Sequence, residues 1–141
     1  MPRSRRIVVR RVVKADVPVV WDALADVAAH TEWMADARAI RFATSRTAGV
    51  GTVFDCDTKV GPFRLTDRME IIEWDPERAM AVRHVGVVTG EGRFTLAPHR
   101  KGTELTWDET LHFPWWIPSV PAALALKLIW RRNLKRLEQT L

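Results

Sequence analysis

Residues 114–141 read PWWIPSVPAALALKLIWRRNLKRLEQTL, and this C-terminal stretch decides the fold. Proline is tolerated in the first turn of a helix, so Pro121 indicates a helix start, with Ser119 as its predicted cap. Beyond Pro121 neither Pro nor Gly interrupts the chain, which predicts one long helix to about Leu141. Apolar residues recur at steps of three or four and predict one buried face: Val120, Ala123, Leu126, Trp130, Leu134, Leu137 and Leu141.

The chain before this helix alternates apolar and polar residues with the period of two that is typical of strands. A β-branched strand at 7–14 opens the chain, and six further strands are predicted at 37–44, 51–60, 63–74, 79–86, 88–97 and 103–113. Turn residues rich in Gly, Pro and Asp separate these six strands. Such short connections favour an antiparallel meander.

Two short helices are predicted between the first strand and the meander. Asp16 stands before Val17 and Pro18, and Asp followed by Pro is typical of a helix start. Asp26 is predicted to cap a second short helix that ends near Trp33. This order of elements predicts an α+β domain whose curved antiparallel sheet wraps around the C-terminal helix. A strongly twisted sheet often leaves its concave side unfilled, so we expect a pocket between sheet and helix.

Composition sets the outer limits on function. The 141 residues are expected to form one domain, 1–141, because 47% are hydrophobic and 28% are charged, as in ordinary globular proteins. The one cysteine, Cys56, allows neither an intrachain disulfide nor a cysteine-based zinc cluster, and we expect it to be inert packing. Charges interrupt each apolar run before it reaches the length of a signal peptide or a membrane span, which predicts a cytoplasmic protein.

Positive charge is concentrated near the two ends of the sequence. The net charge is +5, and residues 1–14 and 127–136 contain only basic charged side chains. One interpretation is a solvated helix face together with an arginine-rich start. The other is weak, salt-sensitive contact with an anionic membrane surface or with DNA. We expect no specific nucleic-acid binding, because charge runs alone do not read sequence.

Three ionisable residues interrupt otherwise apolar inward faces of the predicted sheet: Asp67, His84 and Glu109. They are the candidate catalytic residues. Trp115 and Trp116 lie between two prolines, where they either pack under the helix start or form an apolar lid at the pocket mouth. The full set of predicted ligand-binding residues is Phe54, Met69, Val82, His84, Phe94, Trp107, Glu109, Leu111, Trp115 and Trp116.

The predicted register brings these polar residues toward one another. A tight turn at 75–78 places His84 opposite Met69 and diagonal to Asp67. Glu109 lies beyond Gly92, two strand spacings or roughly 10 Å from His84. We expect this glycine, with Gly90 beside it, to leave room for a ligand.

Two roles are open for His84. It either forms a structural hydrogen bond to Asp67 or backbone, or it contacts a ligand as a polar handle or proton donor. We expect burial to keep its ring neutral. No local spacing supports an iron site built from the histidine and two carboxylates, so we predict no metal and no cofactor.

Several segments together resemble a known family. Residues 15–26 (ADVPVVWDALAD) with Trp33, 49–52 (GVGT), 73–76 (EWDP) and 102–107 (GTELTW) resemble the START-like helix-grip superfamily (SRPBCC), in its polyketide cyclase/dehydrase branch. The resemblance covers nearly the whole chain and implies the helix-grip fold. Members of the superfamily include lipid carriers, aromatase/cyclases, hormone receptors, chaperone activators and oxygenase domains. The resemblance implies no particular catalytic residue, so function depends on the site.

Three functions therefore stay open. The first is binding of an apolar lipid-, quinone- or polyketide-like molecule. The second is a cyclase, aromatase or dehydratase in which His84 is the general acid/base and Asp67 or Glu109 orients it. The third is a peripheral lipid or quinone chaperone that uses Trp115, Trp116 and the basic helix end at a membrane.

Overall fold

The computed structural model of the chain describes residues 3–141 and contains the elements predicted from the sequence. In chain order these are β1 (Ser4–Val13), α1 (Val17–Ala25), the 3₁₀ turn η1 (Val27–Ala29), α2 (His30–Trp33), β2 (Ala37–Phe42), β3 (Val53–Val60), β4 (Phe63–Asp75), β5 (Ala79–Val85), β6 (Thr89–His99), β7 (Gly102–His112) and α3 (Ser119–Thr140). The strands form one antiparallel sheet in the order β1-β7-β6-β5-β4-β3-β2.

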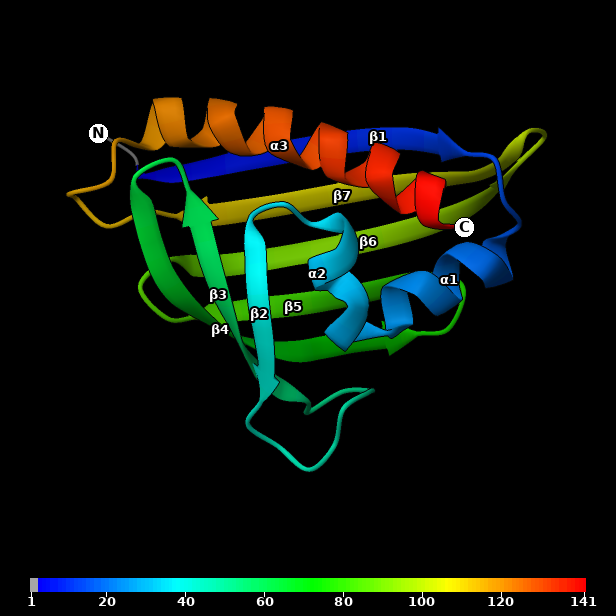
Figure 1. Cartoon of the computed structure of the whole chain (residues 1–141), viewed down its shortest axis with the longest axis horizontal. Coiled ribbons are helices and arrows are strands. Elements are labelled where there is room, and N and C mark those ends of the chain that lie inside the picture. Colours follow the sequence, from blue (N-terminus) through cyan, green and yellow to red (C-terminus); the bar gives the residue numbers. More distant parts are fainter. Residues whose placement is uncertain (1–2) are drawn as a thin grey trace.

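The sheet is strongly curved, and all the helices lie on one side of it (Figure 1). The central strands run nearly parallel to α3, while β2 and β3 cross them steeply at one end. The long helix packs on β1, and α2 contacts both α3 and β2. The curved α+β sheet around a C-terminal helix, with two short helices after the first strand, is therefore confirmed as a helix-grip fold.

The start of α3 differs in detail from the prediction. Ser119 is the first helical residue, and Pro118 occupies the cap position without a side-chain cap. The Ser119 hydroxyl oxygen instead accepts a hydrogen bond of 3.3 Å from Nε of Arg5 on β1. This contact fixes the helix start against the first strand.

The buried face of α3 is narrower than the predicted one. Leu126, Trp130, Leu134 and Leu137 are buried as expected, and Ala123 is half-buried. Val120 and Leu141, however, keep 50% and 43% of their surface exposed. Val120 lies about 80° around the helix from Trp130, at the edge of the stripe. Leu141 follows the last helical turn, so no element covers it.

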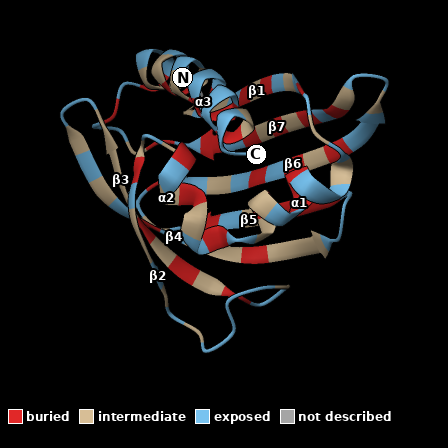
Figure 2. Cartoon of the chain, turned by 45° about the vertical axis from the view of Figure 1, so that its right-hand side comes forward, coloured by how far each residue is buried: buried red, intermediate tan, exposed pale blue. Residues whose placement is uncertain are grey.

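Aromatic side chains join α3 to the sheet. The indoles of Trp107 on β7 and Trp130 on α3 stack with ring centroids 4.5 Å apart. Trp33 at the end of α2 meets Trp107 edge-on at 6.2 Å. Figure 2 shows buried residues along the strands of the sheet and along the helices that cover it. These contacts place the core on one side of the sheet.

The inward face of β4 contains one irregularity that alternation did not predict. The pairing of β4 with β5 shifts register between Ile71 and Glu73, as at a β-bulge. Ile71 is fully buried, and beyond the bulge Trp74 packs edge-on against Trp21 of α1, with ring centroids 5.3 Å apart. After the bulge β4 therefore packs against α1, whereas the residues of β4 before the bulge face α3.

Candidate functional site

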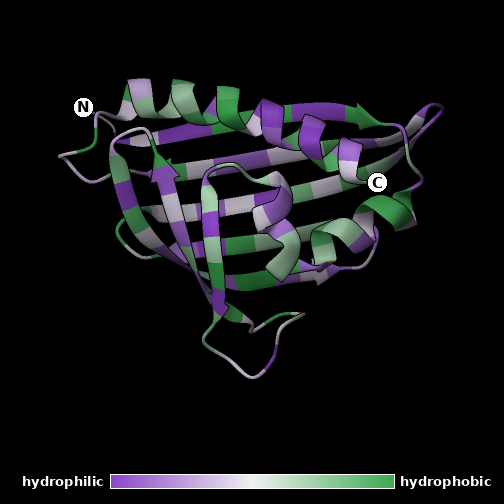
Figure 3. Ribbon diagram, viewed as in Figure 1, coloured by the Kyte–Doolittle hydropathy of each residue, from purple (hydrophilic) through white to green (hydrophobic). Residues whose placement is uncertain are grey.

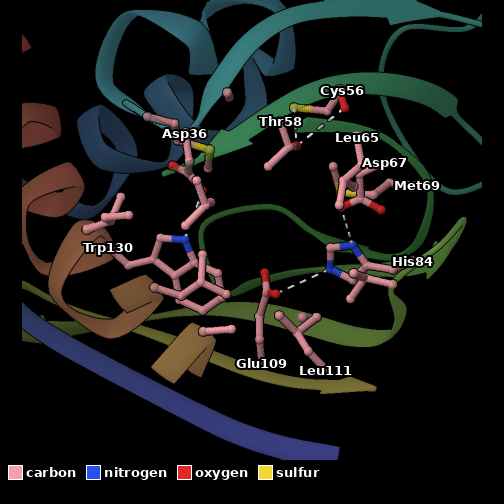
Figure 4. A pocket seen from close by; sticks show the side chains of 18 of the residues that line it. Asp36, Cys56, Thr58, Leu65, Asp67, Met69, His84, Glu109, Leu111 and Trp130 are labelled. Carbon is pink, nitrogen blue, oxygen red and sulfur yellow. Dashed lines mark hydrogen bonds and ion pairs between the residues drawn. The ribbon is translucent and has the colours of Figure 1, made fainter. Parts of the chain in front are cut away.

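A cavity of about 380 Å³ lies between the concave side of the sheet and α3. This volume exceeds the roughly 300 Å³ that a drug-sized ligand requires. Its wall is mostly apolar, and Figure 4 shows side chains from the sheet and from α3 converging on the space. Eight of the ten residues predicted to bind ligand line it: Phe54, Met69, Val82, His84, Phe94, Trp107, Glu109 and Leu111.

The other two predicted residues lie outside this wall. Trp115 and Trp116 follow β7, with 86% and 45% of their surface exposed. Trp116 approaches Phe63, which lines the cavity, with ring centroids 6.2 Å apart. Trp116 therefore stands beside the cavity, and Trp115 is too exposed to pack under the helix start.

Asp67, His84 and Glu109 form one buried cluster on the cavity wall (Figure 4). The predicted pairing of His84 with Met69 is confirmed, and this register puts Asp67 on the same face of β4. Nδ1 of His84 donates a 2.7 Å hydrogen bond to Oδ2 of Asp67. On the other side, Nε2 of His84 lies 3.3 Å from Oε2 of Glu109. The imidazole thus bridges two carboxylates that come from β4 and β7.

The expected 10 Å separation between His84 and Glu109 is wrong for their side chains. Gly92 of β6 lies between them, since it pairs with Val82 on one side and with Glu109 on the other. A Cβ atom at Gly92 would lie 2.5 Å from Oε1 of Glu109. The Glu109 carboxylate therefore occupies the space that a side chain at residue 92 would fill. We expected a ligand to occupy this space. The carboxylate lies over the glycine and meets the histidine.

Gly90 has a different role from Gly92. Its φ is +130°, and a Cβ atom there would fall on the backbone carbonyl of Thr110, with a separation of 2.0 Å. Only glycine tolerates this close approach of β6 to β7. Gly90 pairs with His84, so this close approach of the strands lies at the sheet position beside the histidine.

The charge state of His84 also differs from the expectation of a neutral ring. Burial lowers the pKa of His84. The charge of Glu109 and the hydrogen bonds to Asp67 and Glu109 raise this pKa by a larger amount, so that it lies at about 10. The ring is therefore an imidazolium at neutral pH. The expectation failed because it weighed one nearby carboxylate, whereas two contact the ring. Burial in turn raises the pKa of Asp67, and the hydrogen bond from His84 offsets part of that rise.

Indole nitrogens hold two carboxylates of the cavity wall. Nε1 of Trp107 donates to Oε1 of Glu109 at 2.9 Å. Nε1 of Trp130 donates to Oδ2 of Asp36 at 3.1 Å. Nδ2 of Asn133 donates to Oδ1 of Asp36 at 2.8 Å. The stacked tryptophans therefore position acids on the sheet and on the segment before β2.

Sequence reasoning missed two polar residues of the cavity wall, Asp36 and His30. Neither lies on a strand, so alternation gave no signal for them. The His30 ring donates a 2.7 Å hydrogen bond from Nε2 to the carbonyl oxygen of Leu24. Burial lowers the pKa of His30 to about 4, so this ring is neutral.

Neither metal nor thiol chemistry has support from this geometry. Among residues 3–141, no group of three or more His, Cys, Asp or Glu side chains is arranged to hold a metal ion. Cys56 lines the cavity, and burial raises the pKa of its thiol to about 11. A neutral thiol is a poor nucleophile. In the same described range, none of the helices has an apolar run long enough to cross a bilayer.

Solved structures with the same fold come from distant organisms. The ginseng major latex-like protein 151 from Panax ginseng is similar with a TM-score of 0.80 at 11% identity, over 98% of this chain and 97% of that one. The Zhui aromatase/cyclase from Streptomyces sp. R1128 has a TM-score of 0.77 at 18% identity, over 97% and 93%. Protein MLL2253 from Mesorhizobium loti has a TM-score of 0.72 at 20% identity, over 96% and 95%. Identities this low establish the fold alone.

Family membership rests on the sequence itself. No protein of curated function matches the chain. The family model described as "Polyketide cyclase / dehydrase and lipid transport" matches residues 4–141, from the first residue of β1 to the end of the sequence. The match includes each strand that forms the cavity and the helix that covers it. The chain therefore belongs to the polyketide cyclase/dehydrase and lipid transport family.

Proposed function

We propose that this protein binds an apolar small molecule of lipid-, quinone- or polyketide-like character in the cavity between the sheet and α3. One observation supports this above all others, namely an apolar cavity of about 380 Å³ with one buried polar cluster on its wall. Such a combination gives affinity through apolar burial and orientation through a few polar contacts.

The charge of His84 favours binding over catalysis. A general acid/base works best when its pKa lies near the operating pH. Glu109 and Asp67 outweigh burial and hold the His84 pKa at about 10, so the ring keeps its proton throughout the neutral range. A ring that stays protonated near neutral pH orients ligands and neighbouring carboxylates well, but it exchanges protons poorly there.

A ligand carried through purification would test the proposal directly. Native mass spectrometry of the gently purified protein should show an apolar adduct that organic extraction releases. Ala125→Trp places an indole in the cavity, whereas Leu124→Trp places one on the exposed side of the same helix. The adduct should disappear in the first variant and persist in the second. Equal loading of both variants would refute binding in this cavity.

The second candidate function is a cyclase, aromatase or dehydratase. Its support is the position of His84, a proton donor flanked by Asp67 and Glu109 on the wall of a closed apolar space. In this case His84→Gln should lower turnover of the true substrate roughly 100-fold while binding survives. If the variant binds ligand normally and the wild type converts no polyketide-like substrate, the protein is a binder.

The surface beside the cavity suits an anionic membrane. Val120, Leu124 and Leu128 follow one another at steps of four and form an exposed apolar stripe on α3, which we call the outer stripe. Lys127, Arg131 and Lys135 continue the same side of the helix toward its C-terminus. Figure 3 shows this change from hydrophobic to hydrophilic residues along α3. Apolar residues flanked by basic ones are typical of interfacial helices.

The outer stripe is also continuous with the cavity wall. Pro121, Ala122 and Ala125 of the same helix line the cavity, and Trp116 adjoins Phe63 on that wall. A ligand that enters from a membrane would therefore pass from one apolar surface to the next. We propose weak, salt-sensitive contact of this side with an anionic membrane surface.

A further inference from the structure

One acceptor atom in the buried cluster has no partner. Oδ2 of Asp67 accepts the hydrogen bond from His84, but Oδ1 of Asp67 has no hydrogen-bond partner in the described part of the chain. Nε2 of His84 and Oε2 of Glu109 also lack a well-directed hydrogen bond, yet they face each other at 3.3 Å as an ion pair. Asp67 is therefore the member of the cluster with an unused oxygen. A buried oxygen without a donor costs free energy that a suitable ligand group would recover.

Among residues 3–141, the fully buried side-chain nitrogen and oxygen atoms of the cavity wall outside the cluster have hydrogen-bond partners. Both oxygens of Asp36 accept hydrogen bonds from α3, and Nε2 of His30 is bonded to backbone. The Thr58 hydroxyl donates to the carbonyl oxygen of Cys56 at 3.4 Å. The unused hydrogen-bonding capacity of the wall is thus concentrated at Asp67, beside His84.

The charges of the cavity wall select against anionic ligands. Asp36, Asp67 and Glu109 line the cavity, and His84 is the one imidazolium that faces them. Arg93 also lines the cavity, but its guanidinium binds Glu73 on the exposed side of the sheet. The interior is therefore rich in acceptors and poor in positive charge. A ligand carboxylate would meet like charges in a medium that screens them weakly.

We infer that the bound molecule has an apolar body and a hydrogen-bond-donating end, a hydroxyl or a protonated amine, which donates to the carboxylate of Asp67 beside His84, and that the cavity rejects apolar carboxylates. This inference rests on the proposed function and narrows its ligand class. Phenols, alcohols and amines with a single apolar scaffold fit the description. Free fatty acids do not.

Matched probes on the wild-type protein test this selectivity. The neutral fluorophore N-phenyl-1-naphthylamine reports occupancy of the cavity, and decanol, decylamine and decanoate compete for it at pH 7.5. Decanol and decylamine should each bind at least about tenfold tighter than decanoate, the scale of one hydrogen bond to a charged group. If decanoate competes as well as decanol, the inference is overturned and the binding function stands. If the fluorophore and all three probes fail to bind, the proposed function itself fails.

Two variants separate hydrogen bonding from general charge. Asp67→Asn keeps an oxygen for His84 and turns an amide toward the unused position, so the preference for decanol over decanoate should vanish. Asp36→Asn removes a wall charge whose oxygens are already occupied, so it should ease binding of decanoate but leave the affinity for decanol unchanged. Equal loss of decanol affinity in both variants would overturn the inference, since the hydrogen bond to Asp67 would then contribute nothing of its own. Preference for decylamine alone in the wild type would also overturn it, since charge would then explain the whole selection.

Discussion

Nδ1 of His84 donates a 2.7 Å hydrogen bond to Oδ2 of Asp67 inside the cavity wall. The bond links β5 to β4, and it holds the imidazole ring so that the opposite nitrogen faces Glu109. The chain has thus placed one cation between two buried acids. Breaking one side of such an arrangement leaves a buried charge without compensation. The protonation of this cluster should therefore affect both stability and binding.

His84 should make the protein less stable as the pH rises. Its folded-state pKa of about 10 lies above the ordinary 6.5, so the stabilisation is complete below pH 6.5 and is lost as the pH approaches 10. The free energy of unfolding should fall by about 2 kcal/mol between pH 6.5 and pH 8.5. Chemical denaturation at a series of pH values measures this slope.

The matched variants for that slope are His84→Gln and His112→Gln. The first removes the buried titrating ring, so its stability should vary little over the same range. The second changes an exposed histidine and should keep the wild-type slope. A wild-type slope that persists in His84→Gln would show that another group titrates.

Gly92→Ala should separate Glu109 from His84. The new Cβ would lie 2.5 Å from Oε1 of Glu109, so the carboxylate must move away from its place over residue 92 of β6. Because Glu109 is the largest of the interactions that raise the His84 pKa, that pKa should fall. NMR titration of the imidazole would show the shift, and we expect a stability loss of about 1–3 kcal/mol.

A double-mutant cycle provides the control for Gly92→Ala. In a Glu109→Ala background there is no carboxylate to displace, so Gly92→Ala should leave the His84 pKa almost unchanged. An equal shift in both backgrounds would mean that the alanine acts through the backbone.

Most of the fold was predictable because its signals are local. Period-two alternation and turn residues mark each strand, and the stretch after Pro121 has no helix breaker. The bulge between Ile71 and Glu73 was not predictable, since it depends on pairing with β5. The exposure of Val120 was also missed, because a step of three or four residues does not fix the edge of a helix face.

The candidate site was predictable in its register but not in its electrostatics. Alternation and one tight turn were sufficient to place Asp67, His84 and Glu109 on one face. Whether Glu109 would reach His84 depended on side-chain space over Gly92, which strand spacing does not describe. The position of Asp36 depended on Asn133, 97 residues away. Contacts of this kind arise only when the sheet closes on α3.

His30 should make the protein less stable in acid. Its ring is buried and neutral, and burial lowers its pKa from 6.5 to about 4. The stabilisation is therefore present above pH 6.5 and lost as the pH falls toward 4, by about 3 kcal/mol. His30→Asn should be less stable at pH 7 and less sensitive between pH 6.5 and pH 4. Unchanged acid sensitivity in the variant would assign this effect to the carboxylates.

The outer stripe of α3 should determine contact with membranes. We expect the protein to float with anionic vesicles at low salt and to separate from them at high salt, because the basic residues beside the stripe act through screened charge. Leu124→Glu puts an acid in the centre of the stripe, at a side chain that is 65% exposed, and should reduce vesicle binding several-fold. Val19→Glu makes the same change on α1, at the other end of the molecule, and should bind like the wild type. If both variants bind vesicles equally, or if neutral vesicles bind as well as anionic ones, α3 is not the membrane-facing surface.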